Sequence, residues 1–202
     1  YTVSMARPRE YDEELARSAA LTAFRQTGFE GTSLTDLEQA TGVGRRQLYN
    51  QYGDKRGVFL QALKDFQSLV AGLMLKELES PDAGLAQVKD ALPLLIRKGT
   101  RIGDSMGCLL CNTASEPIAM ADDEIRSMIV GYWERIENAY RNALSNATQS
   151  GELRMTPRQI DRSARGFRAA HLAICLMMRA GEPRPRLMDV ARHSIASLDT
   201  MS

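Results

Sequence analysis

The sequence predicts an all-α protein. Apolar side chains recur three or four positions apart along most of the 202 residues, which is the spacing of one face of a helix. The sequence lacks the alternating apolar and polar runs between turns that are typical of strands. Glycine, proline and aspartate interrupt the helical pattern at intervals, so we expect several separate helices.

Composition and charge narrow the class of protein. Apolar residues make up 44% and charged residues 25%, and 26 basic against 25 acidic side chains give a net charge of +1. These proportions are typical of a globular protein, and the balanced charge by itself gives no reason to expect nucleic-acid binding. The longest apolar run, Leu172–Met178, is far shorter than the roughly 20 residues that cross a bilayer, so we expect no membrane contact. Three cysteines without an export signal predict the cytoplasm, and we expect Met5, which follows Tyr-Thr-Val-Ser, to be the native start.

Four helices are predicted in the first part of the chain. Gly28 ends the first, because glycine commonly follows the last turn of a helix. Ser33 is a good N-cap for the second, with the acidic Asp36 in its first turn, and Asp54 caps the fourth. Ser80-Pro81-Asp82 is a clear break after that helix. The predicted spans are 12–27, 33–42, about 45–51 and about 55–79.

Five further helices are predicted beyond the break. Thr156 and Gln159 can form a capping box around Pro157, which suits the first position of a helix. Pro93 should kink or split the helix that contains it. The predicted spans are about 84–101, 106–116, 122–149, 157–180 and 186–200. We place one domain over residues 5–56 and a larger one over 57–202, with helix 55–79 linking them.

The segment from Thr32 to Gln51 has the spacing of a helix-turn-helix, whose second helix enters the major groove of DNA. Arginine matches guanine, and glutamine or asparagine matches adenine, through paired hydrogen bonds. Lys55 and Arg56 can meet phosphates, and Arg7 and Arg9 can form a basic arm. The alternative interpretation is that these basic side chains only solvate the protein surface. The second helix offers Arg45, Arg46, Gln47 and Asn50.

Three blocks at fixed spacing, G-F-E-G-T-S, A-T-G-V and L-Y-x-x-Y-x-x-K, make residues 12–59 resemble the TetR family of one-component repressors. The resemblance implies that Tyr49 and Lys55 meet the phosphate backbone and that Arg45, Arg46 and Gln47 face the bases. We add Ser33 and Asn50 to the DNA-binding candidates. Gly44 departs from the family by standing where a side chain often caps the recognition helix, and Tyr52 stands where phenylalanine is usual.

The resemblance also implies that residues from about 82 onward form an all-helical ligand-binding and dimerisation domain. We therefore expect a homodimeric regulator, most simply a repressor, that binds a pseudo-palindromic operator and is released by a small apolar organic inducer. Small residues along helix 157–180 suit a dimer seam formed with helix 186–200. The ligand-binding candidates, between helices 84–116, 122–149 and 157–180, are Cys108, Asn112, Tyr132, Trp133 and His171.

The cysteines leave several interpretations open. Gly107–Glu116 resembles a G-C-L-x-x-N block of one branch of the family, in which some members sense electrophiles through a cysteine at the position of Cys108. Cys108 and Cys111 share a helix face, as do His171 and Cys175, so these residues can pack the core, act as a redox or electrophile sensor, or supply ligands for zinc. We expect core packing, with no metal and no other cofactor. A thiol- or metal-dependent enzyme is not expected, because no catalytic triad pattern, HExxH motif or phosphate loop is present.

Overall fold

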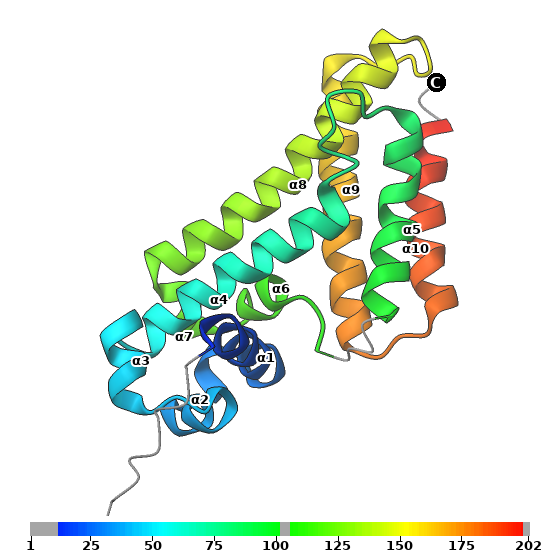
Figure 1. Ribbon diagram of the computed structural model, residues 1–202. Helices are drawn as coiled ribbons and strands as arrows, with labels where there is room; N and C mark the ends of the chain where they lie inside the picture. The colour runs from blue at the N-terminus through cyan, green and yellow to red at the C-terminus, as the bar shows by residue number, and fades with distance from the viewer. Residues whose placement is uncertain (1–11, 102–105, 200–202) are drawn as a thin grey trace, which may run out of the picture.

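The computed structural model describes residues 12–101 and 106–199, and every regular element within these ranges is helical (Figure 1). The all-α prediction is therefore confirmed. A small group of helices at the N-terminus is joined by the long α4 to a larger helical domain. Met5 and the arm with Arg7 and Arg9 lie outside the described residues.

The N-terminal helices pack around an aromatic centre. Phe24 of α1 (Glu13–Gly31) meets Phe59 of α4 (Lys55–Val70) edge to face, with ring centroids 4.8 Å apart. Leu37 of α2 (Leu34–Thr41) and Leu48 of α3 (Arg45–Tyr52) are buried in the same core. This packing holds α2 and α3 in place, because both helices are too short to be stable alone.

Local signals fix the ends of these helices. The Ser33 hydroxyl accepts a hydrogen bond from the Asp36 amide and the Asp36 carboxylate accepts one from the Ser33 amide, which completes a capping box. Gly42 ends α2 with a φ of 68°, a conformation that favours glycine. At Gly28 the backbone leaves the helical conformation as predicted, with a φ of 78°, but a further turn carries α1 to Gly31.

The predicted single helix over 55–79 is wrong in its second half. α4 ends at Val70, and a π-helical turn, η1 (Ala71–Leu75), follows before the chain continues as turns. The wider turn presents Ala71, Met74 and Leu75 to the core together, and Gly72, a weak helix former, lies within it. The window Lys55–Leu75 is long and apolar enough to cross a membrane, yet half of it is buried inside the protein, as in the core helix of a globular fold.

The larger domain is built on two long helices, α8 (Asp123–Gln149) and α9 (Pro157–Arg179), which pack closely. Tyr140 stacks on Phe167 between them, with ring centroids 5.0 Å apart. Alongside α9 stand α5 (Leu85–Arg101) and α10 (Arg184–Asp199) (Figure 1). The predicted capping box of Thr156 and Gln159 is confirmed.

One prediction in this domain is wrong, and another is correct in at most one of its two alternatives. Pro93 does not split α5, and a kink at Pro93 stays a prediction; Lys89, whose carbonyl a proline leaves unpaired in a helix, is exposed to water. The predicted helix 106–116 is instead the short α6 (Leu109–Thr113), followed by a second short helix that sequence analysis missed, α7 (Pro117–Ala121). Pro117 at the first position of α7 ends the preceding segment and starts the new one.

Candidate functional site

The outer face of α3 presents only polar groups and one aromatic ring. Leu48 is 3% exposed and anchors the helix, whereas the candidate DNA-contacting residues around it are exposed. An exposed, short polar helix that follows a glycine turn has the form of a recognition helix. The exposed candidates are Arg45, Arg46, Gln47, Tyr49 and Asn50.

The N-terminus of α3 is capped by a side chain from another helix. Gly44 supplies no side-chain cap, but one carboxylate oxygen of Glu38 in α2 accepts a hydrogen bond from the Arg45 backbone amide at 2.7 Å. The other oxygen pairs with the Arg45 guanidinium at 3.2 Å. Glu38 thus replaces the missing cap and positions Arg45, a role that the sequence did not reveal because the two residues lie on different helices.

Lys55 and Arg56 both bind partners within the protein, although neither side chain is fully buried. The Lys55 ammonium donates to the carbonyls of Phe29 and Thr32, at 2.9 and 3.1 Å, and lies 4.5 Å from the centre of the Phe29 ring. The Arg56 guanidinium pairs with Asp122 and Glu124 at the start of α8, and this hydrogen bonding lowers the pKa of Asp122 to about 2. Both cationic side chains therefore connect segments of the fold. Phosphate contact by Lys55 stays a prediction.

A cavity of about 90 Å³ lies where α1, α4, η1, α5, α8 and α9 meet. Its wall is mostly apolar, with Phe66, Leu73 and Met178 among the lining residues. His171 is 6% exposed, and burial lowers its pKa to about 4, so its ring is neutral at pH 7. Burial also raises the pKa of Tyr132. The polar groups on the wall are Arg25, Cys108, Tyr132, His171 and Cys175.

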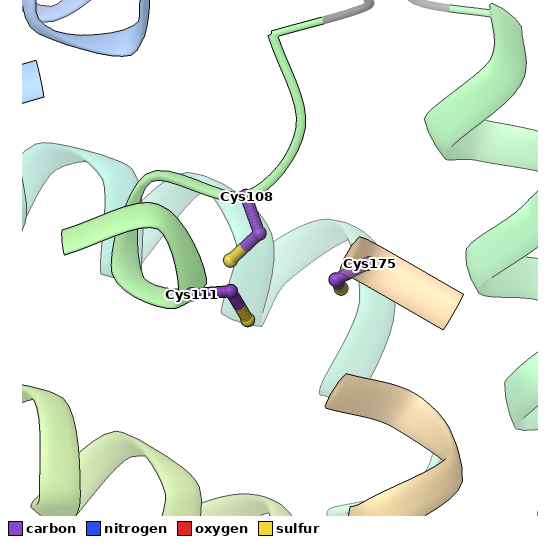
Figure 2. Close-up of side chains that lie close together, drawn as sticks. All are labelled: Cys108, Cys111 and Cys175. Carbon is purple, nitrogen blue, oxygen red and sulfur yellow. The ribbon is translucent and has the colours of Figure 1, made fainter. Parts of the chain in front are cut away.

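Three thiols gather beside this cavity (Figure 2). The Sγ atoms of Cys108, Cys111 and Cys175 all lie within 4.8 Å of one another. Cys108 precedes the first residue of α6, Cys111 lies within α6, and Cys175 faces them from α9. Hydrogen bonds from the other two thiols lower the pKa of Cys108, whereas the same contacts with Cys108 raise the pKa of Cys111 and of Cys175.

The cavity also touches the N-terminal domain. Arg25 of α1 lies over the Phe66 ring, 5.4 Å from its centre, and donates to the Gly107 carbonyl at 3.2 Å. Arg179, at the end of α9, donates to the Met106 carbonyl at 2.9 Å. Sequence analysis missed both arginines. Neither belongs to a motif, and their partners lie far away along the chain.

Residues 17–62 match the family described as bacterial regulatory proteins, tetR family. The chain is 30% identical over 199 residues to the HTH-type transcriptional regulator YezE of Bacillus subtilis (strain 168), a match that covers 96% of this chain and 100% of that protein. The chain belongs to the TetR family. It is accordingly a DNA-binding transcriptional regulator of the helix-turn-helix type.

Two further proteins are similar to this TetR-family chain. The HTH-type transcriptional repressor BdcR of Escherichia coli (strain K12) is 27% identical over 132 residues, which are 65% of this chain and 64% of BdcR. A solved cysteine mutant of the TetR family regulator CifR, complexed with a 26bp double-strand operator DNA, has the same fold, with a TM-score of 0.83. That match is 21% identical and covers 96% of this chain and 100% of CifR.

The structure brings three of the five predicted ligand-binding residues of this TetR-family protein to the cavity: Cys108, Tyr132 and His171. Asn112 is not among the lining residues, and its amide instead donates to the Met106 carbonyl at 2.7 Å. Trp133 packs, half-buried, against the core and is also absent from the cavity wall. Neighbouring residues on a helix point in different directions, and of this pair only Tyr132 lines the cavity.

Proposed function

We propose that this TetR-family protein is a cytoplasmic, homodimeric repressor that a small, largely apolar molecule releases from its operator. The observation that carries the proposal is that α1 and α4 each belong to both sites. Arg25 and Phe66 line the cavity, while Phe24 and Phe59 of the same helices form the core that supports α3.

The contact between α3 and α4 leaves little freedom. A Cβ atom at Gly57 of α4 would lie 1.8 Å from the carbonyl oxygen of Tyr52, so the end of α3 sits directly on the first turn of α4. A change in the tilt of α4 therefore moves α3. A ligand acts in this way only if it binds one position of α4 more tightly than the other.

The cavity favours small, weakly polar ligands. Its lining is mostly apolar, and the neutral His171 ring and the Tyr132 hydroxyl can fix the orientation of a polar atom. A volume of about 90 Å³ suits a molecule of only a few heavy atoms, unless the side chains of the wall rearrange.

A dimer is supported by the recognition helix and by α9. α3 has eight residues and can read only a few base pairs, so two copies on a two-fold site give useful specificity. The exposed face of α9 carries a stripe of small side chains that ends at an apolar residue 61% exposed, Leu176. Small residues let a second helix approach closely. The stripe consists of Gly166, Ala169 and Ala173.

Fluorescence anisotropy of the full-length protein with double-stranded DNA fragments flanking its own gene tests DNA reading. We expect Arg46→Ala to weaken binding to the preferred fragment by about 1–3 kcal/mol and to relax its preference at one or two positions. Arg158→Ala, which removes an exposed arginine of α9, is the charge-matched control. Unchanged operator preference in Arg45→Ala, Arg46→Ala and Gln47→Ala together would exclude α3 as the reading helix.

A thermal-shift screen of small apolar compounds, followed by competition for the DNA, tests the inducer. We expect stabilising compounds to lower operator affinity, and a bulky Gly99→Leu change, whose side chain would extend toward Met178 of the cavity wall, to abolish the shift. Compounds that stabilise the protein but never displace DNA would contradict the proposal.

A second candidate function, thiol-based sensing of electrophiles through Cys108, is favoured by the lowered pKa of that thiol. Only a thiolate reacts quickly, so we expect iodoacetamide to modify Cys108 in the folded protein well before Cys175, with loss of DNA affinity. Slow and equal labelling of all three cysteines would return them to a packing role.

A further inference from the structure

The three thiols form a compact set of sulfur atoms that could bind one metal or metalloid ion. Neither a redox role nor core packing requires three thiols at one place. Two of them come from the α6 segment and the third from α9, and the three side chains lie near one another (Figure 2), with all three sulfurs within 4.8 Å. Cys175 is 3% exposed, and Cys108 and Cys111 are half-buried. The groups around them are chiefly apolar, and Cys108 and Cys175 both reach the cavity wall.

We propose that Cys108, Cys111 and Cys175 are a three-thiolate binding site for trivalent arsenic. Trivalent arsenic is pyramidal, so three sulfurs that each lie about 2.3 Å from it are about 3.5 Å apart. The sulfurs here are within 4.8 Å of one another, so the most distant pair needs to close by about 1.3 Å. Rotation of the side chains can supply that movement without a change in the backbone.

Charge selects the ion. Three thiolates carry three negative charges, and a trivalent centre neutralises them completely, whereas Zn²⁺ leaves one charge and Cu⁺ leaves two uncompensated. An unpaired charge in an apolar interior is costly. Zn²⁺ also prefers a fourth ligand, and His171, although it lines the same cavity, is not part of the compact set.

The binding reaction needs no oxidant or reductant. Arsenous acid, As(OH)₃, is small and uncharged at neutral pH, so the apolar cavity admits it. Each of the three thiols forms an As–S bond while one As–O bond breaks, and the thiol proton leaves with the hydroxyl group as water. Cys108, whose thiolate the neighbouring thiols stabilise, makes the first attack.

The test uses the full-length protein, reduced with a phosphine rather than a dithiol, and titrated with sodium arsenite. Native mass spectrometry should show one arsenic per chain with the loss of three hydrogens. Calorimetry should show affinity falling on the order of 100-fold in each of Cys108→Ser, Cys111→Ser and Cys175→Ser, because each removes one of three linked contacts.

Phenylarsine oxide provides the matched control, because it takes only two thiols. Every single variant keeps two neighbouring thiols and should still bind this reagent, which separates a lost ligand from a misfolded chain. If a variant bound neither reagent, the decision would rest on the native mass spectrum of the unchanged protein, in which the loss of three hydrogens on binding arsenite indicates three thiolate ligands. Arsenite bound to Cys175→Ser as tightly as to the unchanged protein, or bound with the loss of fewer than three hydrogens, would overturn the proposal. No DNA is present, so failure here leaves the repressor proposal standing.

Discussion

The DNA-reading face and the cavity are built in opposite ways. The face is a single short helix whose polar side chains project into water, and its supports, Ser33 and Glu38, both come from α2, the helix that precedes it in the chain. The cavity collects polar groups from α1, α6, α8 and α9 and buries them. The difference shows in the chemistry: burial and close neighbours shift the pKa of His171, Tyr132 and Cys108.

The largest effect is expected where the two regions meet. Gly57→Ala forces a methyl group against the Tyr52 carbonyl, which is backbone and cannot turn aside. We expect a loss of about 3 kcal/mol or more in the free energy of unfolding, together with weakened DNA binding. Gly131→Ala in α8, where an added Cβ meets no other atom within 4 Å, is the matched control and should stabilise the protein by about 0.5–1 kcal/mol. Equal denaturation midpoints for the two variants would show that the end of α3 is not held against α4.

The buried imidazole should make stability depend on pH. His171 has a pKa of about 4 in the fold, below its ordinary 6.5, so between these pH values the unfolded chain binds a proton that the native protein does not. Stability should therefore fall by roughly 3 kcal/mol as the pH drops from 6.5 to 4. Denaturant unfolding at several pH values should show this slope reduced in His171→Gln and retained in His193→Gln, which changes an exposed histidine of α10. If the pH dependence of the free energy of unfolding persists in His171→Gln, other titratable groups cause it.

The smallest effect compares the two capping boxes, one in each region. Ser33→Ala and Thr156→Ala each remove a hydroxyl that accepts a hydrogen bond from a first-turn amide, and each should cost about 1 kcal/mol in thermal or denaturant unfolding. Only Ser33→Ala should also weaken DNA binding, because α2 supports the recognition helix. A similar loss of DNA affinity in Thr156→Ala would mean that general destabilisation, and not the position of α2, is being measured.

Sequence reasoning succeeded where the determining contacts are local. Ser33 as the N-cap of α2 and the capping box of α9 depend on residues at most a few positions apart, so both were predicted from the sequence. It was harder to predict which side chains of α8 face the cavity. Tyr132 and Trp133 were both predicted to bind ligand, and the sequence does not say which of the two rings faces a cavity. The packing of α8 against α4, α5 and α9 places Tyr132 there.

The remaining wrong or missed predictions depend on packing between segments that lie far apart in the sequence. The η1 turn interrupts a regular helical pattern and leaves Ala71, Met74 and Leu75 buried in the core, a packing that the pattern alone does not encode. The convergence of Cys175 with Cys108 and Cys111 depends on how α6 docks against α9, and no spacing in the sequence encodes that distance. For the same reason Arg25 could not be recognised as a cavity residue.

At the joint between the two parts, a reciprocal pair of carboxylates adds to the contacts that Arg25 and Arg56 make. Glu116 accepts a hydrogen bond from the Glu30 amide at 2.8 Å, and Glu30 accepts one from the Ile118 amide at 2.7 Å, while an added Cβ at Gly28 would lie 2.7 Å from Glu116. Anyone grafting this DNA-reading head onto the sensor portion of another regulator would cut that joint if the splice were made after α4. A functional chimera should carry α6 and α7 with the head, or copy Gly28, Glu30 and Glu116 together.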